Sequence, residues 1–591
     1  MRSVLCFAVL FLVRIVSSEE HVTSCVDVER NFVPETNNFK QPVCICADKG
    51  IFSTISGFAI ECESSSITTI TANLKSLNGT EIGALTIRDS TINVLPNDMF
   101  VNVHPKQLKL ERCGISSLTS SGFGSIGDSV EYLSLRDNRV KILQSNLFES
   151  FSKIKTIDLT GNKISEIQDG AFGKLKNLQE LMMNGNELTE LTPGMFRGLK
   201  ALKKLNLENC AIQKIHKATF QGLDSLEQLI LAENQLETLD WTMFSSLKNL
   251  RILDIGSNKL QNVEMKSMKK LEKLILNNNH IDSMKNVRLR DLPSLVVVMI
   301  DRNKMSSIGD KDLMGLVRSE RIETLSLSWN NISEVGQKTF QSIPHLISLL
   351  LQNNQLTQLS TNSTPFLEPL KNLQTLQVSA NNLTVIRAGE LPKSLLNLAL
   401  DHNTITRIEP RALEGMALKR IYLHSNKLQF LYQGAFDSIV PSSLEAIDVS
   451  LNNWQCVCKD PKEWLPRWLS AAEESDVSEG PIGCLAIPGC GNGGVIEEFE
   501  EEEEVIRSGW ITVAATILTV VTICMMVFIA LLYFKDHRHQ FSLRGRRSDS
   551  DLHKLIENDP LNLPTDSILI VPAMPKRNNG PKKTVRFQQT Y

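Results

Sequence analysis

The sequence predicts an α/β solenoid, in which stacked coils carry short parallel strands on a concave face, with disulfide caps at both ends and one transmembrane helix after them. Three observations predict it. A block of 24 residues recurs along the 591-residue chain, cysteines cluster on both sides of the recurring blocks, and a long uncharged apolar segment follows. One such block cannot bury its apolar side chains alone, so neighbouring blocks must stack.

Composition and charge restrict the class of function. The chain is 42% hydrophobic and carries a formal net charge of −3. It is neither basic enough for a nucleic-acid binder nor acidic enough to be disordered throughout. We therefore expect an ordered protein with no nucleic-acid partner.

Residues 1–18 open the chain with an apolar segment. Arg2 precedes an apolar stretch from Val4 to Val13, and the small residues Ser17 and Ser18 follow. This order is typical of a secretory signal peptide. We expect this segment to be removed from the mature protein.

The recurring block fills residues 81–453. Four copies start at Ile154, Leu178, Leu202 and Leu226 with the pattern LxxLxLxxNxL. Alignment of the asparagine position gives sixteen slots, of which thirteen hold asparagine. The slots are Ser90, Cys113, Asn138, Asn162, Asn186, Cys210, Asn234, Asn258, Asn279, Asn303, Asn330, Asn354, Asn381, Asn403, Asn426 and Asn452.

Each block predicts a short, half-buried strand. Leu205 and Leu207 alternate with Asn206, so the leucines should enter the core and Asn206 should face outward. A phenylalanine ten residues after the slot, such as Phe172 or Phe220, should fill the outer half of each coil. Sixteen strands spaced roughly 4.8 Å apart would form a sheet about 75 Å long.

The pattern resembles the leucine-rich repeat superfamily, and the resemblance covers nearly all of the chain before the second apolar segment. It implies a horseshoe in which the slot side chain is buried and hydrogen-bonded to neighbouring coils, with cysteine as the usual substitute. Cys210 and Cys113 fill such slots. A nucleophile, a metal ligand or half of a distant disulfide are the alternatives for Cys210. We favour the buried structural role, and two slots four coils apart should not pair.

The remaining cysteines predict disulfide caps at residues 19–80 and 454–492. The gaps between them are too unequal to favour zinc. The family resemblance implies the C-terminal bridges, whereas an unusually long gap after Cys25 leaves the N-terminal pairing open. The N-terminal cysteines are Cys25, Cys44, Cys46 and Cys62, and the implied C-terminal bridges are Cys456 with Cys484 and Cys458 with Cys490.

An acidic linker at residues 493–509 leads to an uncharged apolar segment at residues 510–534. As a helix this segment would be roughly 37 Å long, enough to cross a hydrocarbon core of about 30 Å. Basic residues such as Lys535, Arg538 and Arg544 crowd its far side. The positive-inside rule then predicts a single-pass type I protein of the plasma membrane, with an extracellular N-terminus and a cytoplasmic tail at residues 535–591.

The sequence does not suggest an enzyme. It shows no arrangement of serine, histidine and aspartate, no paired-carboxylate motif and no phosphate-binding glycine loop. We therefore expect no catalytic residues, no cofactor and no metal.

The outward strand positions predict a ligand-binding patch on the concave face. Its middle section is unusually apolar, and exposed apolar patches usually mark protein contacts. The alternative is that glycans or neighbouring side chains cover it. The patch comprises Ile230, Ile275, Val297, Met299 and Leu350, and the predicted glycosylation sites are Asn78, Asn331, Asn362 and Asn382.

Two functions fit this layout. The layout resembles invertebrate developmental leucine-rich repeat membrane proteins, which implies a cell-surface receptor or adhesion protein that binds a protein ligand. The alternative is a structural organiser of extracellular matrix, with a cuticle or moulting role, that does not need the tail.

The tail holds a candidate sorting signal for clathrin adaptors, DLHKLI. Asp551 supplies the carboxylate, and Leu555 with Ile556 supplies the apolar pair. A short amphipathic turn is the alternative, because brief motifs often match by chance.

The segment KKTVRF near the C-terminus fits the pattern by which many proteins bind type-one protein phosphatase. Val585 and Phe587 alternate, so both would enter apolar pockets when the segment adds to a sheet edge, with Lys583 before them. A basic terminus that matches by chance is the alternative.

Overall fold

The structure is a computed structural model of the chain. It describes residues 25–30, 32, 44–47, 57–77, 82–97, 99–101, 103–429, 431 and 433–455, together with the short segments 476–477, 484–485 and 589–590. All of these residues belong to one of the chain's two compact units.

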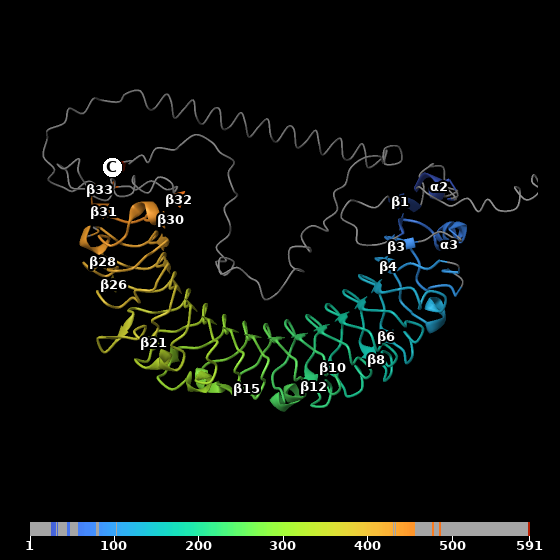
Figure 1. The fold of residues 1–591 in the computed structure, drawn as a ribbon, viewed down its shortest axis with the longest axis horizontal. Coiled ribbons are helices and arrows are strands. Elements are labelled where there is room, and N and C mark those ends of the chain that lie inside the picture. Colours follow the sequence, from blue (N-terminus) through green and yellow to red (C-terminus); the bar gives the residue numbers. More distant parts are fainter. Residues whose placement is uncertain are drawn as a thin grey trace, which may run out of the picture. The chain divides into compact units, whose positions relative to one another are not determined.

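One sheet lines the inner side of the repeats (Figure 1). Within the described residues it has 19 strands, and each repeat strand pairs in parallel with the strands before and after it. Its parallel strands are β2 (Phe58–Glu63), β3 (Ile82–Arg88), β4 (Gln107–Glu111), β5 (Tyr132–Ser134), β7 (Thr156–Asp158), β9 (Glu180–Met182), β11 (Lys204–Asn206), β13 (Gln228–Ile230), β14 (Ile252–Asp254), β16 (Lys273–Ile275), β18 (Val297–Met299), β20 (Thr324–Ser326), β22 (Ser348–Leu350), β25 (Thr375–Gln377), β27 (Asn397–Ala399), β29 (Arg420–Tyr422), β30 (Ala446–Asp448) and β32 (Asp476–Val477).

Short strands and 3-10 turns lie along the outer rim, between successive strands of the inner sheet (Figure 1). The parallel pairs are β6 (Ile142–Leu143) with β8 (Glu166–Ile167), β10 (Glu190–Leu191) with β12 (Lys214–Ile215), β15 (Val263–Lys266) with β17 (Val287–Arg290), β19 (Ser307–Ile308) with β21 (Glu334–Val335), and β26 (Val385–Ile386) with β28 (Arg407–Ile408). The remaining short elements are the antiparallel pair β23 (Ser360–Thr361) and β24 (Thr364–Pro365) and the 3-10 turns η1 (Ser120–Phe123), η2 (Trp241–Ser246), η3 (Met284–Asn286), η4 (Met314–Leu316), η5 (Thr339–Ser342), η6 (Gln433–Ala435) and η7 (Pro441–Ser443).

The core confirms the predicted strand register. Leu205 and Leu207 are fully buried, whereas Asn206 between them is partly exposed. The rings of Phe196 and Phe220 are buried and stack with their centroids 6.3 Å apart. Leucines therefore fill the inner half of these coils and phenylalanines the outer half, as the spacing predicts. In other coils Met268, Leu289 and Leu313 take the buried position of the phenylalanine.

Two disulfides close the N-terminal end. Cys25 in α2 (Cys25–Glu29) bonds to Cys46, and Cys44 bonds to Cys62. Strand β1 (Cys44–Ala47) pairs antiparallel with β2, and α3 (Ile67–Ser76) begins where the hydroxyl of Ser66 accepts a hydrogen bond from the Thr69 amide. This settles the pairing that the sequence leaves open.

Of the cysteines in the predicted C-terminal bridges, Cys456, Cys458 and Cys490 lie outside the described residues, and only the backbone of Cys484 is described. Strand β33 (Cys484–Leu485) pairs through its backbone with β31 (Trp454–Gln455) and with β34 (Gln589–Thr590). The bridges stay a prediction.

The signal segment 1–18, the acidic linker 493–509 and the apolar segment 510–534 also lie outside the described residues. Among the helices that the structure does describe, none has the length and apolarity to cross a membrane.

Candidate protein-recognition surface

Four successive strands, β13, β14, β16 and β18, place two rows of side chains on the concave face. The parallel register sets Ile230, Asp254, Ile275 and Met299 side by side in one row. The second row comprises Gln228, Ile252, Lys273 and Val297. Side chains that share a face of neighbouring strands lie about 5 Å apart.

Four of the five predicted patch residues meet on this surface. Ile230, Ile275, Val297 and Met299 are each partly exposed, whereas Ile252 in the second row is buried. We call Ile230, Asp254, Ile275, Val297 and Met299 the central concave patch. The structure therefore places these four residues together, and whether they bind a ligand stays a proposal.

The predicted exposure of Leu350 is wrong. Only 4% of its surface is exposed. Its in-register neighbours Ser326 and Gln377 are also buried, so this part of the concave face is closely packed. A residue that neighbouring coils cover offers a ligand little contact area, so Leu350 does not belong to the patch.

Asp254 is the residue of this surface that sequence reasoning missed. Its Oδ1 accepts a hydrogen bond of 2.9 Å from the Gly256 amide. Burial raises the pKa of the carboxyl group, while Gly256 and the charge of Lys273 act in the opposite direction. A lone carboxylate within an apolar row of outward positions is the signal that could have revealed it.

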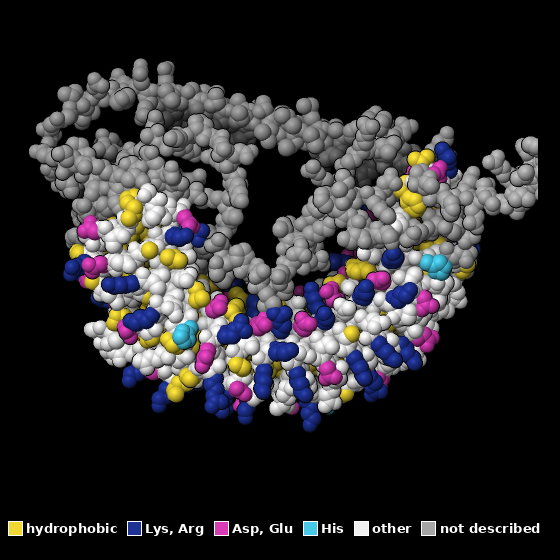
Figure 2. All heavy atoms as spheres, in the orientation of Figure 1, with side chains coloured by type: hydrophobic (Ala, Val, Ile, Leu, Met, Phe, Trp, Pro, Cys, Tyr) yellow, Lys and Arg dark blue, Asp and Glu magenta, His cyan; other side chains and the backbone are white. Residues whose placement is uncertain are grey.

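Charged side chains of both signs border the strands. A hollow beside the patch is lined by Lys203, Glu227, Arg251 and Glu272, among others, and Arg251 forms an ion pair of 3.0 Å with Glu272. Figure 2 shows basic and acidic side chains interspersed over the side of the repeats that is turned to the viewer. A mixed surface of this kind does not suit a polyanion such as nucleic acid.

Cys210 has the buried structural role that we favour from the sequence. Its side chain is fully buried, with the Sγ atom 3.1 Å from the Met183 carbonyl oxygen. Burial raises the pKa of its thiol to about 11. Cys113, the other free cysteine of the described residues, is buried in the same way. A thiol protonated at neutral pH is a poor nucleophile and a poor metal ligand.

Three of the predicted glycosylation sites, Asn331, Asn362 and Asn382, are exposed, whereas Asn78 lies outside the described residues. Glycosylation at these positions stays a prediction.

The two tail motifs also lie outside the described residues. They are the sorting signal with Asp551, Leu555 and Ile556 and the phosphatase-binding segment with Lys583, Val585 and Phe587. The structure tests neither.

The chain matches one family of repeats and several individual proteins in sequence. The family described as "Leucine rich repeat" matches residues 152–212, 201–260 and 371–428. The P-granule-associated novel protein 1 of Caenorhabditis elegans is 73% identical over 593 residues, covering 100% of both chains. Lumican of Gallus gallus is 38% identical over 133 residues, which is 22% of this chain and 38% of that protein.

Among solved structures, that of the TLR13–ssRNA13 complex superposes with a TM-score of 0.59 at 22% identity. It covers 70% of this chain and 59% of that one. At this identity the likeness shows the fold alone.

The full-length relative contradicts the predicted location. The two apolar segments predict a plasma-membrane protein, but the relative that matches over the whole chain is named for its association with P granules. The plasma-membrane prediction is therefore wrong.

Leucine-rich repeat proteins are generally non-enzymatic binding scaffolds, and the matches indicate no enzymatic family. The chain belongs to the family of the P-granule-associated novel protein 1, and it contains leucine-rich repeats.

Proposed function

We propose that this protein is a recognition scaffold that binds a protein ligand through the central concave patch. The observation that carries the proposal is the group of partly exposed apolar side chains on β13, β16 and β18, with the partly exposed Asp254 of β14 among them. Contiguous apolar area on an otherwise charged surface is typical of a protein contact.

The polar groups within the patch would give the contact its orientation. The Asp254 carboxylate lies between Ile230 and Ile275 in its row, and Lys273 is beside it in the second row. A ligand that covers the isoleucines would have to supply a donor to Asp254, because an unpaired buried charge is costly. We therefore expect an apolar ligand surface that carries at least one hydrogen-bond donor or cation.

Charging the patch tests this proposal. The amount of the main protein that co-purifies with the full-length chain should fall at least tenfold with Ile275→Glu and Met299→Glu. The reason is that two carboxylates would have to be desolvated in the contact. Gln221→Glu with Ser245→Glu, at exposed positions outside the strands, is the matched control and should retain that partner.

The melting temperatures of both variants make the result interpretable. Undiminished co-purification with the charged patch would refute the site. A large drop in melting temperature for that variant would show instead that the two side chains support the core.

We also propose that this protein associates with P granules, as the name of its full-length relative indicates for that protein. The fluorescently tagged chain, expressed in Caenorhabditis elegans in place of the relative, should concentrate with P-granule markers. A uniform distribution would contradict this proposal.

The finer role is proposed as recognition of a protein ligand in development, with a structural organiser that does not need the tail as the alternative. The two differ in their need for the tail. A chain that ends after Arg547 should fail to replace the intact protein if the tail recruits phosphatase or clathrin adaptors. Full replacement would favour the structural alternative.

A further inference from the structure

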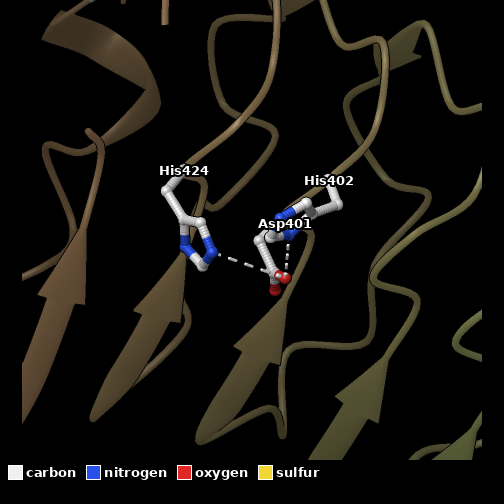
Figure 3. Close-up of side chains that lie close together, drawn as sticks. All are labelled: Asp401, His402 and His424. Carbon is white, nitrogen blue, oxygen red and sulfur yellow. Dashed lines mark hydrogen bonds and ion pairs between the residues drawn. The ribbon is translucent and has the colours of Figure 1, made fainter. Parts of the chain in front are cut away.

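Three side chains converge on the loops that follow β27 and β29 (Figure 3). Asp401, His402 and His424 each point an oxygen or nitrogen atom toward the others, and these atoms all lie within 4.8 Å of one another. The cluster is separate from the central concave patch and lies several coils further along the chain.

The repeat itself brings the cluster together. Asp401 and His424 occupy equivalent positions, two residues before the slots Asn403 and Asn426. The His402 amide donates a hydrogen bond of 3.0 Å to the His424 carbonyl oxygen, which locks the two loops side by side. The backbone of the solenoid therefore fixes the spacing of the three side chains before any ligand binds.

The distances suit a small metal ion. The His402 Nδ1 atom is 3.0 Å from Asp401 Oδ2, and the His424 Nε2 atom is 3.7 Å from the same oxygen. In a tetrahedral zinc site with bonds near 2.0–2.1 Å, neighbouring ligand atoms lie roughly 3.3 Å apart. The two distances lie on either side of that value, so small side-chain movements would complete the geometry.

A second layer of polar groups orients the three side chains. The Ser379 hydroxyl donates to Asp401 Oδ1 at 2.5 Å, which leaves Oδ2 to face the histidines. Asp448 Oδ2 is 3.3 Å from His424 Nδ1, although this buried nitrogen makes no well-directed hydrogen bond. A carboxylate behind the outer nitrogen of a histidine is the usual partner of a metal-binding imidazole, because it directs the other nitrogen to the ion.

We propose that Asp401, His402 and His424 bind one divalent transition-metal ion, with zinc the best match. Two imidazole nitrogens and one carboxylate oxygen suit zinc rather than magnesium or calcium, which prefer oxygen ligands. His402 is 58% exposed, so solvent reaches the site. Three protein ligands leave the fourth position to water or to a ligand atom of a bound molecule.

Zinc titration of the full-length protein tests this site. Protein freed of metal by a chelator is titrated at pH 7.5 in competition with a chromophoric chelator. His424→Gln should bind one equivalent fewer than the wild type, and His345→Gln, at an exposed histidine outside the cluster, should bind the wild-type number. The difference between variants removes the contribution of histidines elsewhere in the chain.

Two further variants separate a metal site from a hydrogen-bonded cluster. Asp448→Asn should weaken this zinc site about 10- to 100-fold without removing it, because Asp448 positions a ligand and is not one. His402→Gln, at an exposed side chain, repeats the test if His424→Gln lowers the melting temperature of the metal-free protein. Equal zinc stoichiometry in the wild type and both histidine variants would overturn the proposal and leave an ion-paired cluster only.

Discussion

Asp254 is a carboxylate that the fold keeps partly out of water. Burial raises its pKa above the ordinary value, so the charged form is less favourable in the folded chain than in the unfolded one. Below the pKa of Asp254 in the unfolded chain, near 3.8, the residue makes its full contribution to the free energy of unfolding. This contribution is lost as the pH rises through its pKa in the folded chain.

Asp254→Asn should therefore raise the melting temperature at pH 7 and leave it unchanged at pH 3, because asparagine can still accept the Gly256 hydrogen bond without a charge. Melting curves of the full-length protein at both pH values measure this. Asp224→Asn, at an exposed position, is the control. A lower melting temperature of Asp254→Asn at pH 7 would contradict the assigned cost of the charge.

Single residues show where sequence reasoning stops. The direction of each strand side chain follows from alternation, because successive residues of a strand face opposite sides. The exposure of Leu350 does not, since Ser326 and Gln377, which flank it in register, come from other coils. The cluster of Asp401 and His424 could have been found, because both stand two residues before a slot.

The slot asparagines join neighbouring coils. The Oδ1 atom of Asn234 accepts hydrogen bonds from the amides of Cys210 and Ile212, and its Nδ2 group donates to the carbonyl oxygens of Leu207 and Leu231, among others. One side chain thus satisfies buried backbone groups of two coils, which would otherwise lack partners.

Asn234→Ala should destabilise the chain by about 3 kcal/mol or more, because each buried polar group left without a partner costs roughly 1–3 kcal/mol. Asn382→Ala, at an exposed position beside a slot, should change stability by less than about 0.5 kcal/mol. Urea unfolding followed by circular dichroism compares them. Equal stabilities of the two variants would mean that the hydrogen bonds of the slot asparagines do not join the coils.

At the scale of elements, the sequence predicts the strands well and the N-terminal cap poorly. The repeat constrains each strand many times over, whereas four cysteines with irregular gaps allow three pairings. Their pairing depends on how β1 folds back onto β2, where Cys44 lies opposite Cys62.

Because each coil contacts only its neighbours, damage at one end of the solenoid should stay local. Replacement of Cys44 and Cys62 by alanine removes a bridge with a sequence separation of 18 residues. A closed loop of this size stabilises by about 3 kcal/mol. Hydrogen exchange should therefore accelerate in β2 and β3 and remain unchanged in β13 and β14. Uniform acceleration along the repeats would show that the array unfolds as one unit.

For the whole molecule, the solenoid follows from the period, because stacking is the way in which coils of this pattern bury their leucines. The location does not follow from it. It was predicted from two apolar segments outside the described residues, and the full-length relative contradicts it. The repeats determine the fold, whereas the cellular location of a protein depends on signals that the fold does not contain.

The central claim is that the central concave patch contacts a protein partner, and site-specific photo-crosslinking tests it most directly. A benzophenone amino acid is placed at Ile275 in the full-length tagged chain, and in a second chain at Ser245 in η2, an exposed position outside the strands. We predict a discrete protein adduct from position 275 that disappears with Met299→Glu and is absent from position 245. An adduct from position 245 alone, or one from position 275 that survives Met299→Glu, would contradict the claim.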